Sequence, residues 1–87
     1  MLVRYFAAAR AAAGTEAETL TLDRPSTRRQ VEALLVRAHP QPVPGQPELG
    51  QVLARSSYLL DGIACPDPDT HIPDQAVLDV LPPFSGG

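Results

Sequence analysis

The stretch TRRQVEALLVRAH, residues 27–39, predicts the main helix of this 87-residue chain. Its apolar residues recur at the spacing i, i+3, i+4 and i+7, which gathers them on one stripe of an α-helix. The stripe consists of Val31, Leu34, Leu35 and Ala38. Thr27 and Gln30 have the spacing of a capping box, in which each side chain satisfies a backbone N–H at the start of the helix. Pro40 ends the helix, because the residue before a proline is pushed out of the helical region.

The charged residues of this helix are expected on its remaining faces. They are Arg28, Arg29, Glu32 and Arg37. A single amphipathic helix has to bury its apolar stripe on one face of a sheet, so the pattern predicts an α+β domain of two layers.

Two segments before the helix predict an antiparallel pair of strands. Leu2–Ala7 is rich in β-branched and aromatic residues, and Ala17–Asp23 alternates apolar with polar residues, the pattern of a half-buried strand. The alanine-rich segment Ala8–Ala13 lies between them and stops at Gly14, which marks a helix end or a turn. The connection between the two strands is therefore longer than a tight hairpin.

Three further strands are predicted after the helix. The runs 57–60 and 63–65 flank Asp61-Gly62, and this dipeptide favours a hairpin because both central residues of a type I′ turn need positive φ. Ala76–Leu81 is largely apolar on both faces, which is typical of a central strand. The other segments predict a proline-rich loop at 40–47, a short helix at Glu48–Arg55 and a second proline-rich loop at 66–73.

The composition argues against several functional classes. The net charge of −3 disfavours a nucleic-acid partner, because phosphates attract a basic surface. The longest apolar run, Tyr5–Ala9, is far shorter than the ~20 residues of a membrane span or the roughly 7–15 of a signal peptide. We therefore expect a cytoplasmic protein that has no membrane partner. All seven basic residues are arginine, which excludes Schiff-base chemistry and a P-loop lysine.

The titratable side chains form no recognisable catalytic set in the sequence. His39 and His71 lack cysteine or glutamate at metal-ligand spacing, so both are interpreted as structural or solvated. The single cysteine, Cys65, is interpreted as a small, semi-buried apolar residue. Asp67 and Asp69 lie in a proline-rich loop, which indicates turn formation rather than a cation site. We therefore expect neither a metal site nor a cofactor bound by this chain.

The C-terminal sequence PPFSGG differs in character from the rest of the chain. Residues 1–81 are expected to form the domain, followed by an extended tail of Pro82, Pro83, Phe84, Ser85, Gly86 and Gly87. The two prolines favour a stiff, extended backbone, and the phenylalanine supplies one large apolar anchor. The glycines have no side chains and can pass through a channel too narrow for other residues. The reactive group at the tip is the α-carboxylate of Gly87; the alternative is a frayed terminus.

These features together resemble the small subunit of molybdopterin synthase, a family of sulfur carriers. The resemblance rests on the order of sheet and helix, the opening YFAAARAAAG at 5–14, the Asp61-Gly62 hairpin and the PPFSGG sequence at 82–87. It covers nearly the whole chain and implies the ubiquitin-like β-grasp fold, a mixed sheet of about five strands packed against one main helix. In that fold the first and last strands lie side by side and parallel, with the helix across them.

The resemblance also implies a function for the tail. The carboxylate of Gly87 is expected to be adenylated by an E1-like activating enzyme, which uses ATP and magnesium, and then to become a thiocarboxylate. Its sulfur is expected to pass to cyclic pyranopterin monophosphate in the large subunit of molybdopterin synthase, a heterotetramer in which this chain is a non-catalytic, sulfur-donating subunit. Gly86 and Ser85 are expected to thread the partner's active site. The expected anchors on the partner are Phe84, Pro83 and Pro82.

Two other functions stay open on the sequence. A sulfur carrier for thiamine-thiazole, cysteine or another thio-product needs the same tail, because only the surfaces that face its partners differ. A ubiquitin-like protein modifier attaches its terminal glycine to lysines of a target. This chain has no lysine, so it cannot be joined into polymers through its own side chains.

Overall fold

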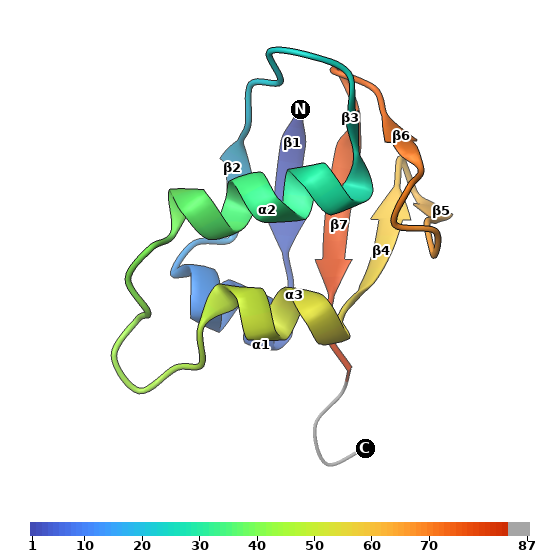
Figure 1. Cartoon of the computed structure of the whole chain (residues 1–87). Helices are drawn as coiled ribbons and strands as arrows, with labels where there is room; N and C mark the ends of the chain where they lie inside the picture. Colours follow the sequence, from blue (N-terminus) through green and yellow to red (C-terminus); the bar gives the residue numbers. More distant parts are fainter. Residues whose placement is uncertain (84–87) are drawn as a thin grey trace.

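The computed structural model describes residues 1–83, and a five-stranded mixed sheet forms its centre (Figure 1). The strands run in the order β2-β1-β7-β4-β5. Their bounds are β1 Leu2–Tyr5, β2 Ala17–Thr19, β4 Ser57–Leu60, β5 Ile63–Ala64 and β7 Val77–Leu81. β1 and β7 are parallel neighbours, with Tyr5 opposite Val80, whereas the other pairs in this sheet are antiparallel. The α+β class and the parallel pairing of the first and last strands are confirmed.

Helix α2, Arg28–Ala38, lies across this sheet (Figure 1). The predicted capping box is present: the Gln30 N–H donates to the Thr27 hydroxyl oxygen at 3.2 Å, and the Thr27 N–H donates to the Gln30 amide oxygen at 2.9 Å.

The apolar stripe of α2 is narrower than predicted. Val31 and Leu35 are fully buried, whereas Leu34 is half-buried and Ala38 is exposed. Val31 and Leu35 lie one turn apart on the same face of the helix, so both point into the core. Leu34 lies at the flank of that face, and Ala38 is the last residue of the helix.

Two short helices pack at the end of the sheet where β7 finishes (Figure 1). α1 spans Ala7–Ala13 and α3 spans Leu49–Arg55, which confirms the short helix predicted at 48–55. α1 ends at Gly14, whose φ of 75° suits glycine and whose N–H donates to the Arg10 carbonyl oxygen at 2.9 Å. The buried residues of the two helices are Ala9, Ala12, Ala13, Leu49, Val52 and Leu53. Among residues 1–83 no helix is long and apolar enough to cross a membrane.

Both N-terminal strands are shorter than predicted. The first ends at Tyr5, because Ala7 already begins α1. The second ends at Thr19, although Leu20 and Leu22 beyond it still pack against the core, which explains why their alternation resembled a longer strand.

The segment 66–73 was predicted as a loop, but it contains a strand. β6, His71–Ile72, pairs antiparallel with β3, Ser26–Thr27, in a separate two-stranded sheet. Each of these two-residue strands is too short to show an alternating pattern. The two strands also lie more than forty positions apart in the sequence. The predicted β4–β5 hairpin is confirmed, with φ of 49° at Asp61 and 83° at Gly62.

Candidate functional site

The chain leaves the sheet from its central strand, at the end where α1 and α3 lie (Figure 1). β7 is paired with β1 on one side and β4 on the other, and its last residue, Leu81, lies opposite Ser57. Pro82 is buried and Pro83 is exposed. Four residues of the predicted tail lie outside the described residues: Phe84, Ser85, Gly86 and Gly87. The described part of the site is therefore the surface around Pro83, from which the tail continues.

A groove of about 510 Å³ begins at this exit point. We call it the exit groove. Its walls come from α1, from α3 and the loop before α3, and from the residues that follow β7. The lining residues include Ala8, Pro47, Gln51, Arg55, Pro82 and Pro83. Apolar side chains thus form much of the wall, and the arginine is exposed at the end of its helix. The sequence contained no local signal for this groove, because its walls come from segments separated by up to about 75 positions.

A second surface, the outer sheet face, lies on the side of the central strands that points away from the core. On β7 the alternation places Leu78 and Val80 in the core, and the intervening residues face outward. The outer sheet face consists of Leu2, Arg4, Leu59, Val77, Asp79 and Leu81. Phe6 continues the outward alternation of β1 and is 41% exposed. The alternation of residues 2–6 could have revealed these residues, once the pairing of β1 with β7 was known.

Arg4 and Asp79 form the polar centre of the outer sheet face. The Arg4 Nε donates to Asp79 Oδ1 at 2.6 Å and the Nη2 donates to Oδ2 at 2.8 Å. The carboxylate is 7% exposed, whereas the guanidinium side chain is 49% exposed. The hydrogen bond and charge of Asp79 raise the pKa of Arg4 above its usual value. The geometry fixes one arginine in a mostly apolar surface, which is a composition common in protein interfaces.

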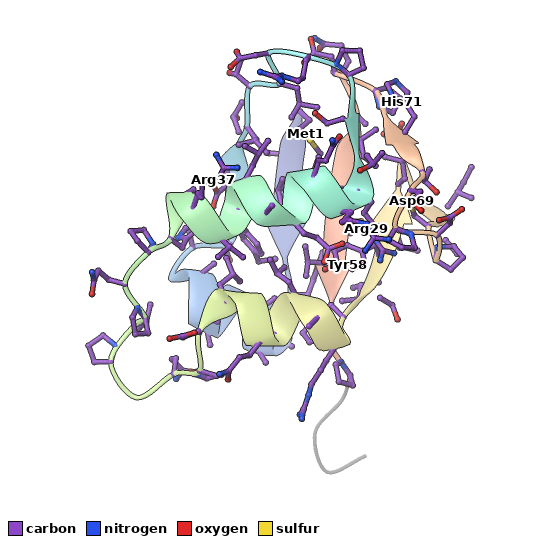
Figure 2. All side chains as sticks on the ribbon, in the orientation of Figure 1. Met1, Arg29, Arg37, Tyr58, Asp69 and His71 are labelled. Atoms are coloured by element: carbon purple, nitrogen blue, oxygen red, sulfur yellow. The ribbon has the colours of Figure 1, made fainter. Side chains whose placement is uncertain are left out.

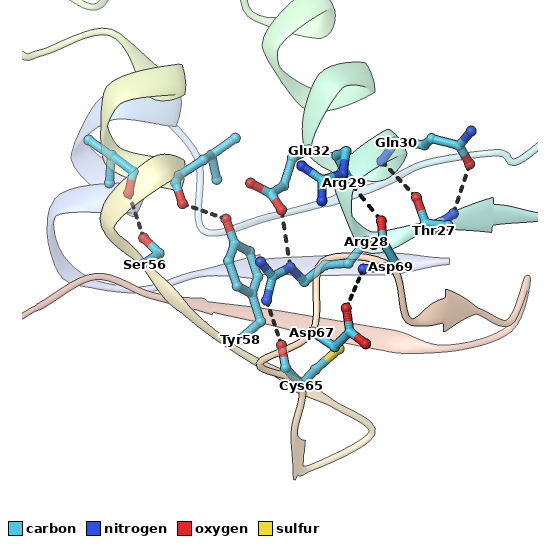
Figure 3. A network of polar contacts seen from close by, with 12 residues as sticks. Thr27, Arg28, Arg29, Gln30, Glu32, Ser56, Tyr58, Cys65, Asp67 and Asp69 are labelled. Atoms are coloured by element: carbon cyan, nitrogen blue, oxygen red, sulfur yellow. Dashed lines mark hydrogen bonds and ion pairs between the residues drawn. The ribbon is translucent and has the colours of Figure 1, made fainter.

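Arg28 was predicted on a face of α2 outside the apolar stripe, and its side chain is largely buried. Figure 3 shows the contacts that it makes. Its guanidinium lies 4.3 Å from the centre of the Tyr58 ring and donates from Nη1 to the Cys65 carbonyl oxygen at 2.6 Å. It also pairs with Glu32 at 3.1 Å, and the Tyr58 hydroxyl donates to the Leu53 carbonyl oxygen at 2.7 Å. Burial raises the pKa of Tyr58. These contacts join α2, α3, β4 and the hairpin, so we assign the cluster to structure.

His39 belongs to a second structural cluster, far along the chain from the tail. Its Nε2 contacts a carboxylate oxygen of Glu18, and the same oxygen accepts the Tyr5 hydroxyl at 3.0 Å. The rings of His39 and Tyr5 meet edge to face, with their centres 6.2 Å apart. Burial, together with the negative charge of Glu18, raises the pKa of Tyr5.

The remaining sequence candidates contribute no chemistry to the site. Cys65 is buried in the core, deeper than the semi-buried position predicted from the sequence. The Asp69 N–H donates to a carboxylate oxygen of Asp67 at 2.8 Å, which confirms the turn. His71 is exposed on β6. Within residues 1–83 no three histidine, cysteine or acidic side chains are grouped so that they could hold a metal ion.

The arrangement of the strands and the main helix identifies the structural class of the protein. A mixed five-stranded sheet with parallel central strands and a helix across it is the ubiquitin-like β-grasp fold, and three solved structures share it. The sequence pattern of the ThiS family matches residues 3–87. The chain belongs to this family of ubiquitin-like sulfur carriers. No curated protein matches the sequence.

The similar solved structures have low sequence identity to this chain. A Pyrococcus furiosus protein, provisionally named molybdopterin converting factor subunit 1, has a TM-score of 0.76 and 21% identity, with 95% of each chain covered. SAMP1 from Haloferax volcanii has a TM-score of 0.75 and 21% identity, covering 100% of this chain and 98% of its own. A second H. volcanii structure, of small archaeal modifier protein 1, has a TM-score of 0.72 and 19% identity, covering 97% of each chain. At these identities the likeness concerns the fold.

Proposed function

We propose that this chain is the sulfur carrier subunit of molybdopterin synthase. An E1-like enzyme adenylates the Gly87 carboxylate with ATP and magnesium, and pyrophosphate leaves. Sulfide-level sulfur (HS⁻) supplied by the partner then attacks the acyl carbon and displaces AMP with loss of a proton, which leaves a thiocarboxylate on the carrier. The large subunit next uses this thiocarboxylate to place sulfur on cyclic pyranopterin monophosphate.

One observation carries this proposal: in a ThiS-family chain, a central strand paired on both sides continues directly into PPFSGG. A carboxylate is a poor electrophile until it is activated, and activation requires that an enzyme encloses it and excludes water. A tail of two prolines, one aromatic residue and two glycines has the slender shape that such enclosure needs. The only polar side chains that line the exit groove are Gln51 and Arg55, among residues 1–83, and neither is an ordinary general base or nucleophile. In this proposal the partners supply the chemistry.

The domain contributes position and contact surface rather than catalysis. β1 and β4 hold the base of the tail on both sides, which fixes the direction in which it leaves the domain. The outer sheet face presents apolar side chains around Arg4, and it reaches the exit at Leu81. We propose that this face docks on the partner enzymes while the tail enters their active sites. Gly86 and Ser85 thread the channel, and Phe84, Pro83 and Pro82 anchor the tail at its mouth.

The test is to incubate the protein with the activating enzyme, ATP, magnesium and a sulfur donor, followed by mass spectrometry of the C-terminal peptide. The expected product carries one sulfur in place of one oxygen, on Gly87 alone. Deletion of Gly87 withdraws the carboxylate by roughly 3.3 Å, and misplacement by about 1 Å already costs around a hundredfold in an enclosed site. The deletion variant should therefore fold and dock but accept no sulfur, and Gly86→Val should behave in the same way. Normal molybdopterin formation by the deletion variant would exclude the carrier mechanism.

A second candidate is a protein modifier, because the SAMP1 structure matches this fold as well as the converting-factor structure does. A carrier for another thio-product is the third, since the family match is to ThiS. Gel filtration with the candidate large subunit separates molybdopterin synthesis from the other two candidates. A stable complex favours molybdopterin synthesis. Absence of a complex, together with attachment of Gly87 to lysines of other proteins, favours the modifier.

A further inference from the structure

We infer that the exit groove is a docking contact for the activating enzyme, and that Arg55 in this groove binds a carboxylate of that enzyme. The inference rests on the proposed function, and it names a residue and a partner chemistry that the function alone does not specify. Activation of the tail is common to sulfur carriers and modifiers, so the inference is independent of the downstream pathway.

The first argument is reach. Under the proposed function the reactive group is the carboxylate of Gly87, which is four residues beyond Pro83, and four extended residues span about 13–14 Å. For Gly87 to reach a catalytic centre inside an enzyme, the mouth of that centre must lie within this distance of Pro83. Pro82 and Pro83 are themselves part of the wall of the exit groove. An interface of ordinary size covers about 800 Å² on each partner, so one centred on the tail covers the groove as well.

The second argument is charge. Among residues 1–83, four arginines form ion pairs: Arg4 with Asp79, Arg10 with Glu16, Arg28 with Glu32 and Arg29 with Asp69. Three arginines form no ion pair within the same residues: Arg24, Arg37 and Arg55. Of these, Arg55 is the one that lines the exit groove.

The chemistry of the groove selects the partner group. A guanidinium binds a carboxylate through two parallel hydrogen bonds, and a surrounding apolar wall strengthens such a contact by excluding water. Ala8, Pro47 and Pro83 supply that wall beside Arg55. The groove therefore fits an apolar segment of the enzyme that carries one aspartate or glutamate. Such a contact contributes to docking and leaves the chemical step unchanged.

The experiment measures ATP–pyrophosphate exchange by the activating enzyme, with the carrier as the varied substrate. Arg55→Glu should raise KM roughly tenfold or more and leave kcat unchanged, because it removes a charge-assisted contact and adds repulsion. Arg55→Gln should show a smaller rise in KM and a weaker dependence of KM on salt than the wild type. Arg37→Glu is the matched control, because Arg37 is also an exposed arginine in the last turn of a helix and lies on α2, away from the exit (Figure 2).

The outcomes separate the two proposals. Thermal unfolding of each variant shows whether the fold is retained, and Arg55→Gln, which introduces no new charge, serves as the second variant. If the wild type is adenylated and Arg55→Glu has the KM of Arg37→Glu, the docking contact is wrong while the carrier function stands. If the wild type is not adenylated at all, the carrier function itself is wrong, and the contact with it.

Discussion

Arg4 and Asp79 lie opposite each other on the parallel strands β1 and β7, although they are 75 positions apart in the sequence. The guanidinium makes two hydrogen bonds to a carboxylate that is almost completely withdrawn from solvent. A buried charge of this kind is tolerated while its partner is present and becomes costly when the partner is removed. The two residues therefore act as one unit in the stability of the central strands.

This relationship predicts an unequal response to substitution. Arg4→Leu should lower the free energy of unfolding, because it leaves the Asp79 carboxylate buried without a partner. The double variant Arg4→Leu/Asp79→Leu should regain much of that loss, since it removes both charges. Arg10→Leu, which breaks the exposed pair with Glu16, should change stability little and serves as the control. Urea unfolding at constant pH is the measurement; a double variant less stable than Arg4→Leu would contradict the assignment.

On α2 the fully buried residues of the apolar stripe are Val31 and Leu35, whereas Leu34 is half-buried. We therefore expect the two neighbouring leucines to contribute differently to stability. Leu35 is fully buried, and Leu35→Ala should destabilise the domain by roughly 2–5 kcal/mol through the cavity that it leaves. Leu34→Ala should cost clearly less, because Leu34 keeps part of its surface in water. Denaturant unfolding of both variants checks the order. Equal losses of stability in the two variants would show that Leu34 is buried as deeply as Leu35.

The two tyrosines of the chain predict a loss of stability in alkali. Burial raises the pKa of both Tyr5 and Tyr58, whereas an unfolded tyrosine titrates at about 10. Above that pH the unfolded state binds fewer protons than the folded state, so the free energy of unfolding falls as pH rises. Their contribution is fully present below about pH 10. Near-ultraviolet absorbance should show tyrosinate only as the domain unfolds, and an earlier rise at constant far-ultraviolet circular dichroism would refute the prediction.

Phe84 lies outside the described residues, and its role as an anchor stays a prediction. Phe84→Ala should leave the melting temperature nearly unchanged and weaken binding to the large subunit by about 1 kcal/mol or more. Thermal unfolding and a titration of the complex test the two halves separately. A large drop in melting temperature would instead make Phe84 a residue of the core.

Local signals allowed much of the fold to be predicted from the sequence. Thr27 and Gln30 cap α2 through atoms three residues apart, and Asp61-Gly62 forms its turn because of its own backbone preferences. Pairing between strands that are far apart in the sequence has no comparable local signal. The β3–β6 pair joins two dipeptides that each have too few residues to show alternation. Arg28 appeared to belong to a polar helix face, and only the position of Tyr58 on β4 reveals that its side chain is largely buried.

The candidate site divides in the same way. The tail is predicted from its composition alone, and its role stays a prediction because its last four residues lie outside the described residues. The exit groove could not be predicted, since Ala8, Arg55 and Pro83 meet only when α1, α3 and β7 are assembled. Arg4 and Asp79 likewise become partners only through the parallel pairing of the first and last strands.

The double pairing of β7 has a mechanical consequence. A pull on the tail, directed away from the domain, acts along the axis of this strand and stresses its hydrogen bonds to β1 and β4 in shear. Bonds in shear share the force and have to break together, whereas those of an edge strand pulled sideways open one after another. A partner that binds the tail can therefore pull on it without separating β7 from β1 and β4, and the domain stays folded under that load.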